Sequence, residues 1–304
     1  MLKKCSLIFS LLLFLLCGVE RLYYYQHGGF CLSKVISDLK EEFPSTHELP
    51  SLEIQTLLEQ PFHFIGSGGT CFAFLGADQK TVLKLFKHQH LTSHSLLWHI
   101  AFPLSVDIWR LKKILLKEKE HNHKRLPFFF GSCALADEKL KEQTATLYLS
   151  LKKNTLINQT VQLVDQWGFT HTLSLRDTEF ALQEHAELLF SYFQKHLSAG
   201  NLEKCKSGID SLLSLILQRC ALGIGDRDPN LQINFGFVED RAVEIDIGSF
   251  FYDPQLLSPF KQIQELFLCT QALQKWLDKQ SPELLHYLRE QILKYHDAFH
   301  QTAA

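Results

Sequence analysis

The sequence lacks an excess of either charge, since 31 basic and 33 acidic residues leave a net charge of -2. Proteins that bind nucleic acids usually carry a basic surplus, so we expect no nucleic-acid partner. Internal repeats and low-complexity linkers are also absent. Because 46% of the 304 residues are hydrophobic, the composition excludes a disordered chain, and the length suits one large domain or two small ones.

The chain also lacks paired cysteines. Its eight cysteines are scattered, no CxxC pair is present, and their spacing is not that of a zinc site. We therefore expect buried thiols, and disulfides become the better expectation only if the chain is exported.

An uncharged apolar run extends from Cys5 to Val19, between Lys4 and Glu20. At about 1.5 Å per helical residue it covers roughly 22 Å of a hydrocarbon layer about 30 Å thick, which is the length of a signal-peptide core. No small-x-small cleavage site follows, however, and tyrosines at positions 23–25 extend the usable span as an interfacial belt. We predict a single-pass membrane anchor or uncleaved signal over residues 1–25. Secretion after signal cleavage and a buried N-terminal helix are the alternatives.

The rest of the chain is rich in strands first and in helices later. We expect a helical lead-in over residues 26–60, with short helices at 32–43 and 51–59 that prolines end. Apolar and β-branched runs predict strands at 62–65, 71–75, 81–86, 128–130 and 145–151, and a hairpin over 161–175. Three- and four-residue spacing predicts helices at 104–115, 182–197, 209–220 and 260–300, with a strand pair near 231–247. This order indicates an α+β protein with two lobes.

A glycine-rich segment, Ile65-Gly66-Ser67-Gly68-Gly69-Thr70, separates the first two predicted strands. Glycines allow backbone N–H groups to surround phosphate oxygens without a side-chain clash. The segment precedes a strand and not a helix, so neither the Walker loop nor the Rossmann turn fits. Taken alone, it is more typical of an ordinary glycine-rich hairpin than of a phosphate-binding loop.

Lys84 lies in the apolar run 82–86, where a cation needs an anionic partner once it leaves water. A carboxylate and a phosphate are both suitable partners. Glu118 is the first candidate carboxylate because it continues the apolar face of the predicted helix 104–115, and Glu120 is the second. The alternative is a lysine that snorkels from an edge strand.

Two acidic segments flank the strand pair near 231–247. The first is Leu222-Gly223-Ile224-Gly225-Asp226-Arg227, and the second is Glu244-Ile245-Asp246-Ile247-Gly248-Ser249-Phe250. Carboxylates on either side of a hairpin can converge on a divalent cation that bridges phosphates. A solvent-facing turn explains Asp228-Pro229-Asn230 equally well, but it does not explain Asp246 between two isoleucines.

These motifs in this order resemble the protein-kinase-like superfamily over about residues 60–300. The two acidic segments are most similar to the phosphoinositide 3- and 4-kinase branch, in which Gly-Asp-Arg replaces His-Arg-Asp. The resemblance implies a bilobal fold at residues 61–304. A small antiparallel-sheet N-lobe would cover about residues 61–152 and a helical C-lobe about 153–304, preceded by the N-terminal hydrophobic helix.

The resemblance also implies ATP and Mg²⁺ or Mn²⁺ as cofactors. Gly66, Gly68 and Gly69 would cover the phosphates, and Lys84 would contact them after being oriented by Glu118. In the other lobe, Asp226 would be the catalytic base, and Asp246 and Asn230 would be the metal ligands.

Several positions depart from the family pattern. Asn230 comes one residue early, which leaves Asn234 as an alternative ligand, and Cys71 stands in place of the third glycine. No Ala-Pro-Glu follows residue 248, which is evidence against an ordinary protein kinase. Lys3 and Lys4 favour a cytoplasmic N-terminus and hence an external domain, although ATP is abundant in the cytosol.

Two functions therefore stay open. The first is a membrane-associated phosphotransferase that moves the γ-phosphate of ATP to an unknown hydroxyl on a lipid, a small molecule or a protein. The second is a catalytically silent pseudokinase that serves as a nucleotide-binding or protein-interaction scaffold.

Overall fold

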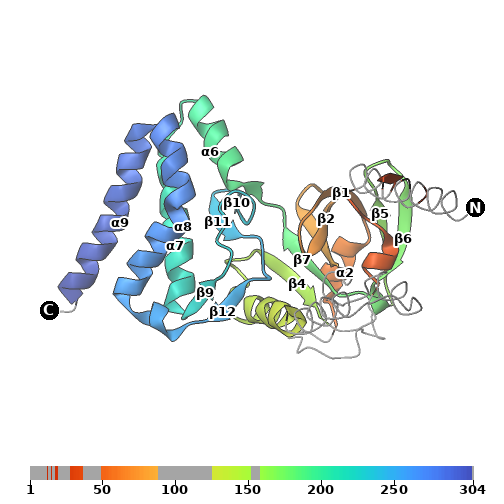
Figure 1. The fold of residues 1–304 in the computed structure, drawn as a ribbon. Helices are drawn as coiled ribbons and strands as arrows, with labels where there is room; N and C mark the ends of the chain where they lie inside the picture. Colours follow the sequence, from red (N-terminus) through yellow and green to blue (C-terminus); the bar gives the residue numbers. More distant parts are fainter. Residues whose placement is uncertain are drawn as a thin grey trace, which may run out of the picture. The chain divides into compact units, whose positions relative to one another are not determined.

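The structure is a computed structural model that describes residues 12, 15, 18, 19, 28–36, 49–87, 125–151 and 158–302, with side chains as far as Tyr295 (Figure 1). The described residues form two compact units. The first unit holds those up to residue 87 together with 158–181, and the second unit holds 125–151 and 182–302. The protein is of the α+β class, as the sequence predicts.

The first unit is built on a mixed sheet. Its strands are β1 (Pro61–Ser67), β2 (Cys71–Gly76), β3 (Thr81–Phe86), β5 (Thr160–Val164) and β6 (Thr170–Ser174), in the order β3-β2-β1-β5-β6. The short-turn pairs β1–β2, β2–β3 and β5–β6 are antiparallel, but β1 and β5 run parallel. The expected antiparallel sheet is corrected in this respect. A tight turn enforces antiparallel pairing, whereas the long chain between β3 and β5 leaves either direction open.

Phenylalanines fill one face of this sheet. Phe72 and Phe74 of β2 are buried, and the ring of Phe30 packs edge-on against them with centroid distances of 5.4 and 5.0 Å. Two helices flank the strands, η1 (Leu32–Lys34) and α2 (Leu52–Leu58), and a third, η2 (Leu175–Asp177), follows β6. The predicted helix at 51–59 is confirmed as α2, whose N-cap Ser51 accepts from Ile54 N. Of the predicted helix at 32–43 only η1 and the turn after it are described.

The second unit contains most of the helices. A helix over residues 125–139 precedes β4 (Thr146–Ser150), and β7 (Phe180–Glu184) leads into β8 (Glu187–Leu188). The later strands are β9 (Ile224–Asp226), β10 (Phe235–Val238), β11 (Arg241–Glu244) and β12 (Phe250–Tyr252). The later helices are α6 (Leu189–Ser198), α7 (Leu202–Ala221), η3 (Pro254–Leu257), α8 (Pro259–Gln280) and α9 (Pro282–Thr302).

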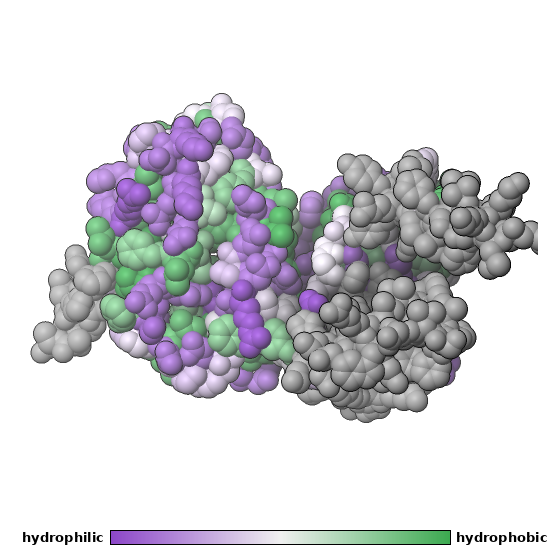
Figure 2. Space-filling model, viewed as in Figure 1, coloured by the Kyte–Doolittle hydropathy of each residue, from purple (hydrophilic) through white to green (hydrophobic). Residues whose placement is uncertain are grey.

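Helix α7 is the centre of this unit, because it contacts α6, α8, α9 and β11 (Figure 1). Its buried face includes Ile209, Leu212, Leu213 and Ile216, which confirms the predicted helix at 209–220. The predicted helix at 260–300 is also confirmed, but Ser281 and Pro282 divide it into α8 and α9. The outer surface of the unit mixes hydrophilic and apolar areas (Figure 2), and Phe260 and Leu268 of α8 are among its exposed apolar side chains.

Two predicted elements are wrong. Phe128–Phe130 belongs to the helix 125–139 and not to a strand, because a short apolar run has the same pattern in a buried helix and in a buried strand. The predicted helix at 182–197 is β7 and β8 followed by α6. The first four residues of β7 are all buried, so the strand shows no alternation that would distinguish it from a helix.

The N-terminal prediction falls mostly outside the described residues. Of the run from Cys5 to Val19, the structure describes Leu12, Leu15, Gly18 and Val19, which are helical. Within the described ranges, no helix has the length and apolar character needed to cross a membrane. The predicted helix at 104–115 and both candidate glutamates, Glu118 and Glu120, also lie outside these ranges.

Candidate functional site

Asp226 ends β9, and its position depends on two glycines before it. Gly223 has φ of +67°, a conformation that favours glycine. Gly225 faces Phe251 across the β9–β12 ladder, where an added Cβ would come within 2.7 Å of the ring. The Gly-x-Gly-Asp sequence is therefore required locally by the backbone turn and by the close packing of β12.

The Asp226 carboxylate is half-buried, and one of its two oxygens accepts two hydrogen bonds. Its Oδ1 accepts hydrogen bonds from the Ser249 hydroxyl and from the backbone N–H of Asp228, the latter at 2.9 Å. Burial raises the pKa of Asp226 above its ordinary value, although both hydrogen bonds oppose that rise. The charge of Arg219 lowers the pKa of Asp226, and the charge of Asp246 raises it.

The loop that carries Asp246 is anchored on the helix 125–139. Ser132 Oγ donates to the Ile247 carbonyl at 2.7 Å and accepts from the Phe250 N–H at 2.6 Å. A Cβ on Gly248 would lie 2.3 Å from the ring of Phe129 in the same helix, so this position requires glycine. The Gly248 N–H in turn donates to Asp246 Oδ1 at 3.0 Å, which fixes the carboxylate.

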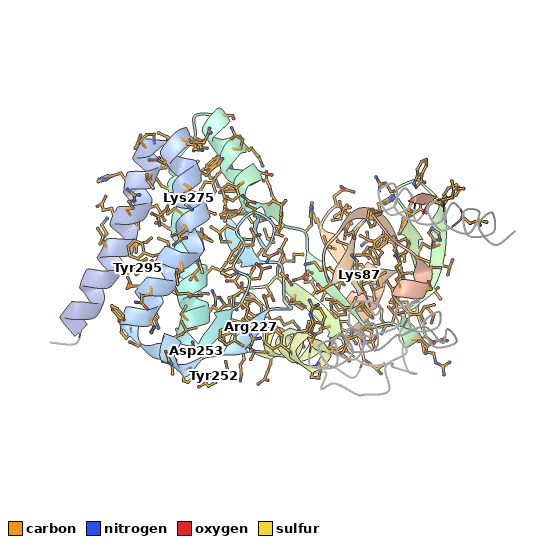
Figure 3. The ribbon with its side chains drawn as sticks, viewed as in Figure 1. Lys87, Arg227, Tyr252, Asp253, Lys275 and Tyr295 are labelled. Atoms are coloured by element: carbon orange, nitrogen blue, oxygen red, sulfur yellow. The ribbon has the colours of Figure 1, made fainter. Side chains whose placement is uncertain are left out.

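The two acidic loops are also bonded to each other. The Arg227 N–H donates to the Ser249 carbonyl at 3.1 Å, and the Ser249 hydroxyl donates to Asp226. The Arg227 guanidinium lies over the ring of Phe128, 3.9 Å from its centroid (Figure 3). The structure thus brings Asp226 and Asp246 together through Ser249 and Ser132. The sequence argument missed both serines, although Ser249 stands inside the quoted motif.

Asn230 and Asn234 differ in the hydrogen bonds that they already make. Asn230 Oδ1 accepts from the Gln232 N–H at 3.0 Å, which closes a local turn. Asn234 directly precedes β10, and its Nδ2 donates to the Asp228 carbonyl at 2.8 Å. Its backbone carbonyl accepts from Ile245, next to Asp246. The hydrogen bond from Asn234 Nδ2 orients that amide and leaves its oxygen for a metal, whereas the Asn230 oxygen is already an acceptor. The geometry therefore favours Asn234 over Asn230 as a metal ligand.

The glycine-rich loop connects β1 and β2 in the first unit. None of Gly66, Gly68 and Gly69 has a positive φ. An added Cβ would meet nothing within 4 Å at Gly66 or Gly69, and only the Cys71 carbonyl at 3.8 Å at Gly68. Gly66 follows an irregularity in the β1–β2 register, which glycine suits. Neither a positive φ nor packing against the described residues requires glycine at positions 68 and 69. Close approach by a ligand would explain them.

Lys84 is the half-buried residue of an otherwise buried strand β3. It is paired with Ala73 of β2, while Cys71 at the start of β2 is paired with Phe86. Lys84 therefore shares its face of the sheet with the residues that follow the glycine-rich loop. The proposed partners Glu118 and Glu120 lie outside the described residues, so their pairing with Lys84 stays a prediction.

A second lysine, Lys87, holds the glycine-rich loop (Figure 3). It is 1% exposed, and its Nζ donates to Ser67 Oγ at 2.7 Å and to the Gly68 carbonyl. The ammonium also lies 4.3 Å from the centroid of Phe72. Burial lowers the pKa of Lys87, and no carboxylate pairs with it in the described part of the chain. Lys87 was not predicted as a site residue, because it lies just after the apolar run 82–86, three residues beyond Lys84.

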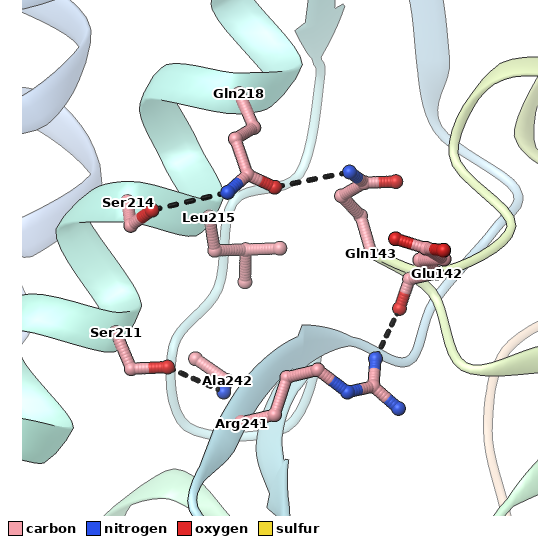
Figure 4. A pocket seen from close by; sticks show the side chains of 8 residues that line it. All are labelled: Glu142, Gln143, Ser211, Ser214, Leu215, Gln218, Arg241 and Ala242. Carbon is pink, nitrogen blue, oxygen red and sulfur yellow. Dashed lines mark hydrogen bonds between the residues drawn. The ribbon is translucent and has the colours of Figure 1, made fainter.

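A polar cavity of about 220 Å³ lies elsewhere in the second unit, between α7 and the start of β11 (Figure 4). Its side chains largely satisfy one another: Gln218 accepts from Gln143 and donates to Ser214, and Arg241 donates to the Glu142 carbonyl. None of the predicted site residues lines it. We therefore take the aspartate pair, and not this cavity, as the candidate site.

No model of a known protein family matches the chain, and no curated protein matches it in sequence. The described residues contain no group of three or more His, Cys, Asp and Glu side chains arranged for a metal. A cation at this site would therefore need oxygen ligands from the amide of an asparagine and from a phosphate, besides the carboxylates.

Proposed function

We propose that the protein is a membrane-associated, kinase-like phosphotransferase that moves the γ-phosphate of ATP to a hydroxyl group, with Mg²⁺ or Mn²⁺ as the cation. One observation carries this proposal: the Ser249 hydroxyl, three residues after Asp246 in the second acidic loop, bonds the Asp226 carboxylate of the first, and the charge of Asp246 raises the pKa of Asp226. Phosphoryl transfer needs such a pair, because one carboxylate positions the attacking hydroxyl while another binds the metal that neutralises the phosphates.

Asp226 is the proposed base. Ser249 and the Asp228 N–H both bond Oδ1, so the carboxylate is oriented and Oδ2 is left to face a hydroxyl. Burial keeps the pKa of Asp226 above its ordinary value, which makes it a better proton acceptor than an exposed aspartate. The proton of the attacking hydroxyl would pass to this carboxylate as the new bond to phosphorus forms.

Asp246 and Asn234 are the proposed metal ligands. Asp246 supplies a carboxylate that the Gly248 N–H orients, and Asn234 supplies an amide oxygen. Mg²⁺ is commonly held by one or two protein oxygens, with phosphates and waters completing its shell, so a small ligand set fits this ion. Bound there, the metal would neutralise charge on the phosphates.

The first unit is proposed to supply the phosphate contacts. The glycines Gly66 and Gly69 leave room for a ligand to approach the loop backbone, while the Gly68 N–H donates to the Cys71 carbonyl at 3.0 Å and holds the turn. Lys84 and Lys87 supply positive charge on β3 and just after it. Lys87 has only neutral partners among the described residues, so a phosphate would give its buried charge a counterion.

Nucleotide binding and turnover test this proposal on the purified full chain. We expect millimolar ATP with Mn²⁺ to raise the melting temperature, and ATP turnover to fall at least 100-fold in Asp226→Asn, within the range typical of lost general-base catalysis. Asp278→Asn, an exposed residue of α8, is the matched control and should retain turnover. No thermal shift and no turnover in the unmodified chain would refute nucleotide binding.

A catalytically silent scaffold is the second candidate, favoured by Cys71 in place of the third glycine. Its signature is distinct: ATP and Mn²⁺ raise the melting temperature, but turnover is absent and Asp226→Asn changes nothing.

We also propose that residues 5–19 anchor the protein in a membrane. Leu12, Leu15 and Val19 are helical and more than half exposed, at 54%, 57% and 66%. Alkaline carbonate extraction tests this: the full chain should stay with membranes, and a chain starting at residue 26 should be released. Protease protection of the intact membranes would show which side the domain faces.

A further inference from the structure

Arg219 is a buried cation in the last turn of α7, with 1% of its surface exposed. Its Nε donates to Glu244 Oε1 at 2.9 Å, its Nη1 to the Ile224 carbonyl at 3.0 Å, and its Nη2 to Glu265 Oε1 at 3.2 Å. A single side chain therefore joins α7, β9, β11 and α8.

Two of these partners lead directly to the aspartates. Ile224 lies two residues before Asp226, and Glu244 lies two residues before Asp246. The strands that carry them belong to different sheets, since β9 pairs with β12 and β11 pairs with β10. Arg219 thus connects the two acidic loops through the strands that precede them. Ser249, which follows Asp246, makes a second connection through its hydrogen bond to Asp226.

Stability alone is a poor explanation for this arrangement. Removing a guanidinium and a carboxylate from water costs about as much as their attraction returns, and apolar side chains of similar volume often serve a core equally well. Glu244 is 2% exposed, and its Oε2 lacks a hydrogen-bond partner. What the ion pairs provide instead is a fixed geometry. A planar guanidinium reaches three acceptors at fixed angles, which an ammonium cannot do.

We propose that Arg219 is a positioning residue, which sets the distance between Asp226 and Asp246. It does so by bonding the Ile224 carbonyl, two residues before Asp226, and the Glu244 side chain, two residues before Asp246. This inference rests on the proposed function, because the distance matters only if both carboxylates act on one metal–phosphate ligand. A misplacement of about 1 Å is enough to cost a reaction about 100-fold.

The test compares Arg219→Lys with Glu265→Gln in the full chain, measuring kcat, KM for ATP, Mn²⁺ affinity and melting temperature. Glu265 bonds the same guanidinium but belongs to α8 and to neither acidic loop, so it is the matched control. We expect Arg219→Lys to lower kcat by about 10- to 100-fold and to weaken Mn²⁺ binding, with KM for ATP changed less than threefold. Glu265→Gln should keep kcat within about threefold of the unmodified chain.

A second variant keeps the test decisive if Arg219→Lys does not fold. Arg219→Gln/Glu244→Gln removes the guanidinium and the fully buried Glu244 carboxylate together, which leaves only Glu265, whose side chain is 16% exposed, without its partner. This variant should therefore fold while losing kcat and Mn²⁺ affinity. Unchanged kcat in a folded Arg219 variant overturns the inference, as does a kcat that falls equally in Glu265→Gln.

The inference and the proposed function fail differently. If the unmodified chain binds Mn²⁺ without turnover, the phosphotransferase proposal fails, and the Mn²⁺ affinities of the Arg219 variants decide the inference. If the unmodified chain binds no Mn²⁺ at all, no ligand unites the aspartates and both are refuted.

Discussion

Ser249 shows how one hydroxyl adjusts the chemistry of an aspartate. Its hydrogen bond to Asp226 lowers the pKa of that carboxyl, whereas burial raises it. Ser249→Ala removes the lowering contribution, so the pKa of Asp226 should rise further. A base is active when deprotonated, and the acidic limb of the kcat/KM profile should therefore move to higher pH. A fall in rate with no movement of that limb would contradict the assigned base.

The glycines fall into two kinds that mutation can separate. Gly248→Ala would place a methyl group against Phe129, and we expect it to lower the free energy of unfolding by about 1–3 kcal/mol. The methyl group of Gly69→Ala would meet no atom of the described residues within 4 Å, so stability should change by less than about 0.5 kcal/mol, while ATP affinity should fall. Thermal denaturation with and without ATP measures both. Equal ATP affinity in Gly69→Ala and the unmodified chain would remove the loop from the nucleotide site.

Lys87 is the residue whose role the structure changes most. In Lys87→Met, an apolar side chain takes the place of a buried ammonium whose described partners are all neutral. The protein without ATP should therefore not lose stability. The thermal shift produced by ATP should shrink, because a positive charge near the phosphates is lost. Lys80→Met, in the exposed turn before β3, is the control and should keep the full shift. A shrunken shift in both variants would indicate a general charge effect.

At the scale of elements, the helix 125–139 is the support of the Asp246 loop. Ser132 is 2% exposed and makes two hydrogen bonds to that loop, to the Ile247 carbonyl and from the Phe250 N–H. Ser132→Ala leaves the Phe250 N–H without this acceptor, which typically costs about 1–3 kcal/mol of unfolding free energy.

We also expect kcat to fall about tenfold in Ser132→Ala as Asp246 loses its support. Ser207→Ala, on an exposed position of α7, should change neither quantity. Chemical denaturation and ATP turnover measure the two effects. If Ser132→Ala is destabilised but its kcat is unchanged, the helix 125–139 has only a structural role.

The elements differ in how far the sequence predicted them. Strands β1 and β2 and helix α7 follow alternation or helical spacing, and both patterns survive because one side of each element is more buried than the other. β7 was mispredicted because a run that is buried all round carries no period. The run Phe128–Phe130 was mispredicted because three apolar residues are too few to distinguish a helix from a strand. The parallel pairing of β5 with β1 depends on a long connection, and no local signal encodes it.

At the scale of the whole molecule, the candidate site was predictable in its acidic residues but not in its supports. Asp246 stands out because a carboxylate between two isoleucines needs a partner, and Asp226 stands out because its Gly-Asp-Arg segment resembles that of the kinase-like family. Ser132, Lys87 and Arg219 act through contacts between segments that are distant in the chain, so sequence spacing alone does not reveal them. The choice between Asn230 and Asn234 also needed the hydrogen bonds around each side chain.

The central claim is that Asp246 binds the metal that ATP needs, and Mn²⁺ titration of the full chain with ATP present tests it most directly. The account predicts saturable, ATP-dependent Mn²⁺ binding in the unmodified protein and a loss of at least tenfold in affinity in Asp246→Asn. The exposed Asp278→Asn protein should bind Mn²⁺ normally. Equal Mn²⁺ affinity in Asp246→Asn and the unmodified chain would contradict the account.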